Sequence, residues 1–103
     1  MNKTVRISLE AETDLADGFW FYEKNELGLG GRFRSSVKTD IRSLEIHGGT
    51  HSKRHGYHRL VSKTFPFSVF YKMESENSLV IVAVFGQRRG AEWIANRLKN
   101  DGG

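Results

Sequence analysis

Two adjacent arginines, Arg88 and Arg89, are the residues of this 103-residue chain with the clearest capacity for chemistry. They follow Leu79–Phe85, seven consecutive apolar residues that predict a strand buried on both faces. A rigid strand end can present guanidinium groups to solvent, where they bind phosphates or carboxylates. Alternatively, Arg89 pairs with Glu92 or caps a terminal helix. Four further basic residues could extend the pair into a cationic groove: Lys53, Arg54, Arg59 and Lys63.

The positive charge of the chain is concentrated in its second half. The net charge is +4 at pH 7, yet residues 1–46 hold seven Lys/Arg and eight Asp/Glu, a net of −1. Residues 47–103 hold nine Lys/Arg and four Asp/Glu, a net of +5. This half is therefore the expected face for an anionic partner, either a nucleic acid or an acidic peptide. A basic surface that only keeps the protein in solution is the alternative.

The four histidines could serve as metal ligands or as a general base. Their spacings of four, four and three residues would align them on one helix face, where imidazoles can bind zinc: His47, His51, His55 and His58. Gly48, Gly49 and Gly56 interrupt this stretch and favour a solvated loop with no metal site. His58 alone could act as a general base beside a phosphate.

Several classes of protein are excluded by what the sequence lacks. Without cysteine there is no disulfide, thiolate metal site or cysteine nucleophile. No apolar run approaches the ~18 residues of a membrane-spanning helix, and the first residues lack the apolar region of a signal peptide. We therefore expect a cytoplasmic protein that needs neither a membrane nor a cofactor. Most aromatic side chains, Trp20 included, recur at core-facing spacings, whereas Trp93 is expected to be partly exposed.

The first half of the chain predicts a strand followed by a helical hairpin. Val5 and Ile7 alternate with polar residues, as in a short strand. Ser8 can cap a helix whose apolar face includes Leu15, and residues 28–31 supply a glycine-rich turn. A second helix is indicated by apolar residues on one face and by two glycines at its end: Phe33, Val37, Ile41 and Leu44, then Gly48 and Gly49.

The second half changes to the period of two that is typical of strands. Alternating residues predict strands over Tyr57–Val61 and Phe67–Met73, before the buried strand Leu79–Phe85. The polar segment Glu74–Asn77 is expected to form a hairpin turn. Ala91–Leu98 can form a short terminal helix.

Taken together, these elements predict an α+β protein of order β-α-α-β-β-β-α. An N-terminal strand precedes a two-helix antiparallel hairpin, a three-stranded antiparallel meander and a short C-terminal helix. The strands form one twisted, mainly antiparallel sheet. The length fits a single domain over residues 1–100, with a tail at 101–103 that is expected to fray.

A set of short motifs, each weak alone, extends over nearly the whole chain in a fixed order. It comprises Glu12–Ala16, Phe21–Glu23, Gly28–Phe33, His58–Leu60, Phe65–Tyr71, Val80–Val84, Arg88–Arg89, and Trp93 with Arg97. The set resembles the RelE/ParE superfamily of toxins from type II toxin–antitoxin systems, particularly its ParE-like, plasmid-stabilisation branch. The resemblance implies a cognate antitoxin as partner, a toxin–antitoxin hetero-oligomer, and growth arrest by poisoning DNA gyrase without chemistry by the toxin itself.

The same resemblance leaves an alternative, a RelE-like ribosome-dependent mRNA endoribonuclease acting on the ribosome and its mRNA. Its candidate catalytic residues are Arg88, Arg59 and His58. The ribonuclease branch expects an arginine at the position of Ser68, a histidine at Phe85-Gly86 and a tyrosine at Trp93-Ile94, so these departures favour the toxin that does no chemistry. A plain nucleic-acid-binding module would explain the charge but not the aromatic and glycine pattern. For target or antitoxin binding, the expected residues are Arg59, Lys63, Arg88, Arg89 and Trp93.

Overall fold

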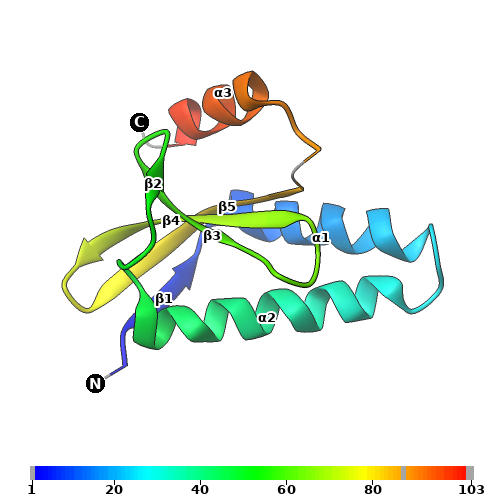
Figure 1. Cartoon of the computed structure of the whole chain (residues 1–103), viewed down its shortest axis with the longest axis horizontal. Helices are drawn as coiled ribbons and strands as arrows, with labels where there is room; N and C mark the ends of the chain where they lie inside the picture. Colours follow the sequence, from blue (N-terminus) through cyan, green and yellow to red (C-terminus); the bar gives the residue numbers. More distant parts are fainter. Residues whose placement is uncertain (1, 87, 102–103) are drawn as a thin grey trace.

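A short strand and a helical hairpin form the first half of the chain in the computed structural model, which describes residues 2–86 and 88–101. Strand β1 spans Thr4–Ile7, helix α1 spans Leu9–Glu23 and helix α2 spans Leu29–His47. The Ser8 hydroxyl accepts a hydrogen bond from the third residue beyond it at 3.1 Å, which confirms the predicted cap of α1. Figure 1 shows the two helices running side by side in opposite directions.

The turn between the two helices lies earlier in the chain than predicted. The sequence indicated a turn over residues 28–31, but α2 already begins at Leu29. Gly28 has no side chain to cap α2, and the carboxylate of Glu23 takes this role by accepting from the N–H groups of Gly28 and Gly30 at 3.0–3.1 Å. A Cβ at Gly30 would lie 2.6 Å from a backbone oxygen of α1, so a glycine here lets the helices approach closely.

Four strands from the second half join β1 in one sheet. They are β2 (Lys53–Arg54), β3 (Tyr57–Val61), β4 (Phe67–Ser75) and β5 (Ser78–Gly86), and the order across the sheet is β1-β5-β4-β3-β2. The predicted antiparallel meander is confirmed as β3-β4-β5. Strand β2 was not predicted, because it is only two residues long and depends on its pairing with β3.

The pairing of β1 makes the sheet mixed. Strand β1 lies parallel to β5, from Thr4 opposite Ser78 to Ile7 opposite Ile81. The hairpin α1–α2 and the strands β2 to β4 lie between β1 and β5 in the sequence. The chain then returns, and β5 lies beside β1 at the edge of the sheet (Figure 1). The expected α+β arrangement in a single sheet holds, with one parallel pair at its β1 edge.

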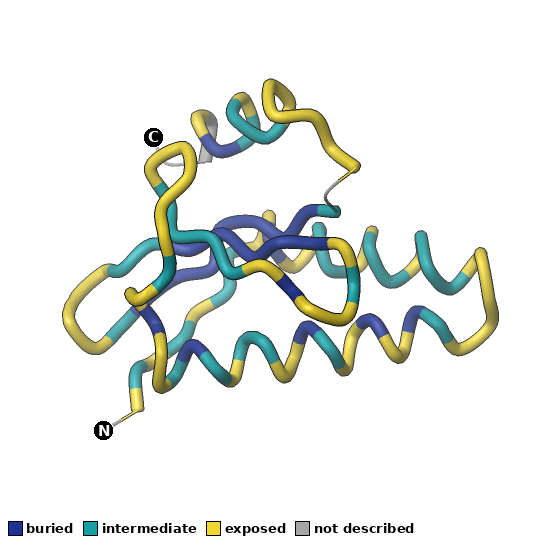
Figure 2. The backbone as a smooth tube through the Cα atoms, in the orientation of Figure 1, coloured by how far each residue is buried: buried dark blue, intermediate teal, exposed yellow. Residues whose placement is uncertain are grey.

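The sheet separates two apolar clusters. Figure 2 shows buried positions along the central strands and on the sheet-facing side of α2. One packs the hairpin against the sheet, and its buried members include Phe33, Leu44, Val69, Tyr71 and Ile81. The other packs α3, which spans Ala91–Asp101, against the opposite face, and its members include Phe70, Val80, Val82, Phe85 and Leu98. Both faces of β5 are thus buried, as the apolar run predicted.

A register shift in β5 changes which residues face the hairpin. Phe70 pairs with Ala83 and Tyr71 pairs with Ile81, which leaves Val82 as an extra residue. As a result, Ile81 and Val84 both contribute to the hairpin-side cluster, whereas strict alternation would have placed Ala83 there. An all-apolar run gives no sequence signal for such a bulge.

The structure differs from the sequence predictions at Trp20 and at the end of α3. Trp20 was expected in the core, but 65% of its surface is exposed on the outside of α1. Helix α3 extends to Asp101, three residues beyond the predicted end, so the first residue of the expected frayed tail is helical and residues 102–103 lie outside the described chain. Within residues 2–86 and 88–101, no helix is both long and apolar enough to span a bilayer.

The central strand provides a test of this packing with a matched control. Replacing Ile81, which is fully buried, by alanine should lower the free energy of unfolding by about 2–5 kcal/mol, because it leaves a cavity. Ile46→Ala removes the same atoms from a side chain that is 66% exposed and should change stability by no more than about 0.5 kcal/mol. Urea denaturation of both variants measures the difference, and similar costs at the two positions would contradict this assignment of the core.

Candidate functional site

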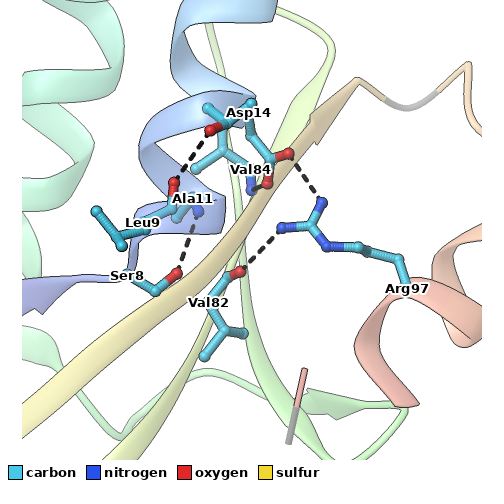
Figure 3. A network of polar contacts seen from close by, with 8 residues as sticks. Ser8, Leu9, Ala11, Asp14, Val82, Val84 and Arg97 are labelled. Atoms are coloured by element: carbon cyan, nitrogen blue, oxygen red, sulfur yellow. Dashed lines mark hydrogen bonds and ion pairs between the residues drawn. The ribbon is translucent and has the colours of Figure 1, made fainter. Parts of the chain in front are cut away.

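An ion pair between α1 and α3 crosses the end of β5. One carboxylate oxygen of Asp14 accepts from Nη1 of Arg97 at 2.8 Å, and the other accepts from the N–H of Val84 at 3.0 Å. The second guanidinium nitrogen of Arg97 donates to the carbonyl of Val82 at 3.4 Å. Figure 3 shows the two side chains meeting beside the strand, Asp14 from the helical hairpin and Arg97 from the terminal helix.

This ion pair occupies the place of a missing strand neighbour. Because β1 pairs only as far as Ile81, the backbone of β5 beyond that point has no strand on this side. Asp14 and Arg97 bond to the two backbone groups left there, those of Val84 and Val82. Burial raises the pKa of the Asp14 carboxyl above its ordinary value of 3.8, and the hydrogen bonds from Arg97 and Val84 oppose this shift only in part.

The ion pair borders a cleft of about 360 Å³ that we call the α1–α3 cleft. Its walls include Glu10, Asp17, Phe21, Phe85, Arg88 and Trp93, together with Asp14 and Arg97. The guanidinium carbon of Arg88 lies 4.0 Å from the centre of the Phe21 ring, in cation–π geometry. The cleft therefore combines carboxylates of α1 with arginines and aromatic rings, and the Arg88 guanidinium reaches the Phe21 ring of α1.

A second cleft, of about 280 Å³, lies between the sheet and the start of α3, and we call it the β-face cleft. Its lining includes Arg54, His55, Arg59, Ser68, Phe70 and Arg89. Nε of Arg59 donates to the hydroxyl of Ser68 at 3.1 Å, which orients the guanidinium along the sheet. His55 stands in the tight turn between β2 and β3 with a φ of 55°, in the left-handed region that non-glycine residues rarely adopt.

The residues expected to bind the target or the antitoxin are divided between these two clefts. Arg59 lies in the β-face cleft, Arg88 lies in the α1–α3 cleft, and Arg89 lines both. Trp93 is 42% exposed, as expected, and the guanidinium of Arg89 lies 4.3 Å from its ring centre. Lys63 is exposed in the loop after β3 and lines neither cleft. The predicted cationic groove is thus formed by Arg54, Arg59 and Arg89 only.

The three candidate catalytic residues do not form one site. His58 stacks on the Tyr71 ring with the centroids 5.0 Å apart, which places it on the hairpin side of the sheet. Arg59, its neighbour, points to the other side, because successive residues of a strand face opposite ways. Arg88 occupies a third position, over Phe21. His58 and Arg59 therefore lie on opposite faces of the sheet, and Arg88 lies apart from both.

The other histidines are held in separate local contacts. His47 ends α2, His55 is in the β2–β3 turn, and His58 donates from Nδ1 to the carbonyl of His51 at 2.6 Å. The Tyr71 hydroxyl accepts from the N–H of Gly49 at 2.9 Å and lies 2.6 Å from Nδ1 of His51. Among the described residues, no group of three or more His, Cys, Asp and Glu side chains is arranged to hold a metal ion.

The His51 imidazole contacts the Tyr71 hydroxyl and is favoured in its neutral form. In the neutral imidazole, Nδ1 accepts the proton of the Tyr71 hydroxyl. Burial, followed by the nearby His58 and His47, lowers the pKa of His51 below its ordinary value of 6.5. Burial likewise raises the pKa of Tyr71, which keeps the hydroxyl protonated and able to donate.

Comparison with known proteins supports the fold rather than a sequence match. No protein-family model and no curated protein matches the chain. A chain of the chromosomal ParDE toxin–antitoxin system from P. aeruginosa superposes with a TM-score of 0.70 at 14% identity, covering 82% of this chain and 95% of that one. A chain of the toxin–antitoxin complex RelBE2 from Mycobacterium tuberculosis gives 0.54 at 19% identity, covering 84% and 99%.

This chain has the fold of those ParDE and RelBE2 chains. The architecture implied by the resemblance to the RelE/ParE superfamily is therefore confirmed. The Asp14–Arg97 ion pair is the feature that sequence reasoning missed. Both residues were part of the resemblance, but they are 83 positions apart and no local pattern links them.

The ion pair makes a prediction about stability. Arg97→Leu leaves the Asp14 carboxylate largely buried without its partner and should cost about 3 kcal/mol of unfolding free energy, at the lower end for broken buried pairs because Arg97 is 21% exposed. Adding Asp14→Asn should restore most of that loss, since the neutral amide still accepts from Val84. Urea denaturation at pH 7 checks this, and equal costs for the single and the double variant would show that charge burial is not the cause.

A second prediction concerns pH. Because the pKa of His51 is lower in the folded protein than in the unfolded chain, the unfolded chain binds the proton more readily. Stability should therefore decrease as the pH falls below 6.5. His51→Asn supplies an oxygen that accepts from Tyr71 and does not titrate, so its stability should depend less on pH than that of the parent over the same range. Parallel pH dependence in thermal melts of the two proteins would refute the role of His51.

Proposed function

We propose that this chain is the toxin component of a type II toxin–antitoxin module in the RelE/ParE superfamily, with residues 1–100 acting as one toxin domain. The observation that carries the proposal is the shared fold, which extends over 95% and 99% of two chains from ParDE and RelBE2 toxin–antitoxin systems. In this proposal the toxin works in the cytoplasm, arrests growth and is neutralised in a hetero-oligomer with a cognate antitoxin.

We further propose that the target is DNA gyrase and that the toxin acts by binding, without catalysis. A ribonuclease must bring a base, an acid and phosphate-stabilising cations to one bond. Here His58, Arg59 and Arg88 lie in three separate environments, and Ser68 occupies the middle-strand position.

One observation supports the endoribonuclease as a second candidate. The β-face cleft gathers Arg54, Arg59 and Arg89 around a volume that also contains His55. Three guanidinium groups can stabilise a phosphorane, and an imidazole can transfer a proton. If the chain cleaves mRNA, His55 takes the role that the sequence assigned to His58.

Growth arrest is the direct test of the toxin proposal. Expression of the chain alone should stop growth, and co-expression of the small protein encoded by the adjacent reading frame should restore it. The charge-removing variant Arg59→Ala should lose about 1 kcal/mol of unfolding free energy, because it removes the hydrogen bond to the buried Ser68 hydroxyl, and it should stay folded. It should also be less toxic if the β-face cleft binds the target. Normal growth at confirmed expression of the folded parent would count against the toxin proposal.

Two assays separate the targets. For a gyrase poison, purified protein should inhibit supercoiling by gyrase and should produce no codon-phased cuts in primer extension on translating ribosomes. For an endoribonuclease, the cuts should appear, and His55→Ala should remove them while His58→Ala, on the other face of the sheet, should not. Cleavage that needs His55 would replace the gyrase proposal by the ribonuclease one.

A further inference from the structure

The outer side of the helical hairpin, which is turned away from the sheet, exposes a row of apolar side chains on α1. The inner side of this helix packs into the core through Ala11 and Tyr22. Leu9, Ala16 and Trp20 follow one another at intervals of seven and four residues, which places them together on the opposite side. Leu9 and Trp20 are 77% and 65% exposed. Apolar side chains in such a row are the usual core of a contact between helices.

The two helices of the hairpin carry opposite charges. Helix α1 contains five carboxylates and neither lysine nor arginine, whereas α2 contains four Lys/Arg and two carboxylates. Glu12 lies beside the apolar row of α1, and Lys38 and Arg42 lie on the side of α2 opposite to the buried Phe33 and Leu44. All three charged residues are exposed, and neither of the two ion pairs in the described part of the chain includes them.

Glu12 and Lys38 lie at the same height along the hairpin. A Cβ at Gly18 would lie 2.7 Å from the Phe33 ring, so these two positions are level on the adjacent helices. Because the helices are antiparallel (Figure 1), the six residues back to Glu12 and the five residues on to Lys38 lead toward the same end. The two distances along the axis are about 9 Å and about 8 Å. A carboxylate and an ammonium group thus stand level with each other, one on each helix.

The same levels bring Trp20 beside the start of α2. Trp20 comes two residues after Gly18, and Gly31 comes two residues before Phe33, so Trp20 and Gly31 are level as well. Gly31 is exposed, and a Cβ placed on it would meet no atom within 4 Å. The outer side of the hairpin therefore has a large projecting ring on α1 and an open glycine position at the same height on α2.

This pattern determines how two copies of the chain can meet. If α1 packed on α1 of a second copy, carboxylates would face carboxylates and repel each other. A two-fold axis that runs along the helices instead places α1 of each copy on α2 of the other, with all heights kept. Glu12 of one copy then faces Lys38 of the other, and Trp20 lies over Gly31. Such a contact is self-complementary and closed, so it ends at two copies.

The size of the surface sets the expected strength of this contact. The 15 residues of α1 extend over about 22 Å, and two helices side by side are about 20 Å wide. The contact therefore covers roughly 400 Å² on each copy, compared with about 800 Å² per partner in a stable complex of standard size. We expect a dimer that forms and dissociates with concentration.

We propose that two copies of this chain associate through the outer sides of their hairpins, α1 of each on α2 of the other, as a four-helix bundle with the Glu12–Lys38 contact made twice. The residues on which this interface depends line neither the α1–α3 cleft nor the β-face cleft. The inference rests on the hairpin surface alone, so it does not depend on whether the chain is a toxin or on its target.

Sedimentation velocity of the purified chain, from about 10 µM to about 1 mM, tests this directly. The apparent mass should rise with concentration from the 11.8 kDa of one copy toward twice that value. Glu12→Lys and Lys38→Glu should each raise the dissociation constant about tenfold or more, because each creates two like-charge contacts across the interface. Trp20→Ala should also weaken the dimer. Thermal melts establish that each variant is folded.

Mixing the two charge variants is the decisive step. In a mixed dimer both contacts join a lysine to a glutamate, so an equimolar mixture of Glu12→Lys and Lys38→Glu should associate although each variant alone does not. The double variant Glu12→Lys/Lys38→Glu should associate like the parent for the same reason. Any arrangement that places α1 on α1 predicts no such recovery.

Two variants with the same charge changes serve as controls. Glu10→Lys alters the side of α1 that lines the α1–α3 cleft, and Lys53→Glu alters β2. Both should leave the dissociation constant of the dimer unchanged. If the parent remains monomeric up to about 1 mM, or if the mixture associates no better than its components, the proposal is wrong.

Discussion

The arrangement of this protein depends on how the backbone N–H and C=O groups near the end of β5 are hydrogen-bonded. The first strand is too short to pair with the whole of β5, and a buried strand with unbonded backbone groups would cost free energy. Asp14 and Arg97 resolve this with side chains in place of a strand. The same contact links α1 and α3 to β5, at the place where two apolar clusters pack the helices against opposite faces of the sheet.

That placement leaves two clefts that differ in the charge of their lining residues. On the hairpin side of β5, the α1–α3 cleft has both signs of charge and an aromatic floor. On the α3 side, the lining residues of the β-face cleft include three arginines and no carboxylate. Arg89 borders both clefts, since the backbone turns there between β5 and α3.

Periodicity predicted most of the fold, because the hairpin and the meander depend on patterns within one element. It did not predict features that depend on contacts between distant segments, because these have no local signal. Such features are the parallel partner of β1, the bulge at Val82 and the pairing of Asp14 with Arg97. The grouping of the candidate site residues shows the same limit of local patterns. Basic residues close in sequence were grouped, but the alternation of a strand sends His58 and Arg59 to opposite faces. Arg88 lines the α1–α3 cleft, whereas Arg89 borders both clefts.

The parallel pairing of β1 with β5 also sets the order in which the chain can fold. Each residue of β1 lies opposite one 74 positions later, whereas the helical hairpin is built from contacts between neighbouring segments. A growing polypeptide can therefore form the hairpin early, but its first strand has no partner until β5 has been synthesised. The ion pair between Arg97 and Asp14 can form only later still, after Arg97 has been synthesised. Both clefts include residues from 85 onward, so neither surface exists on the nascent chain before almost all of the protein has left the ribosome.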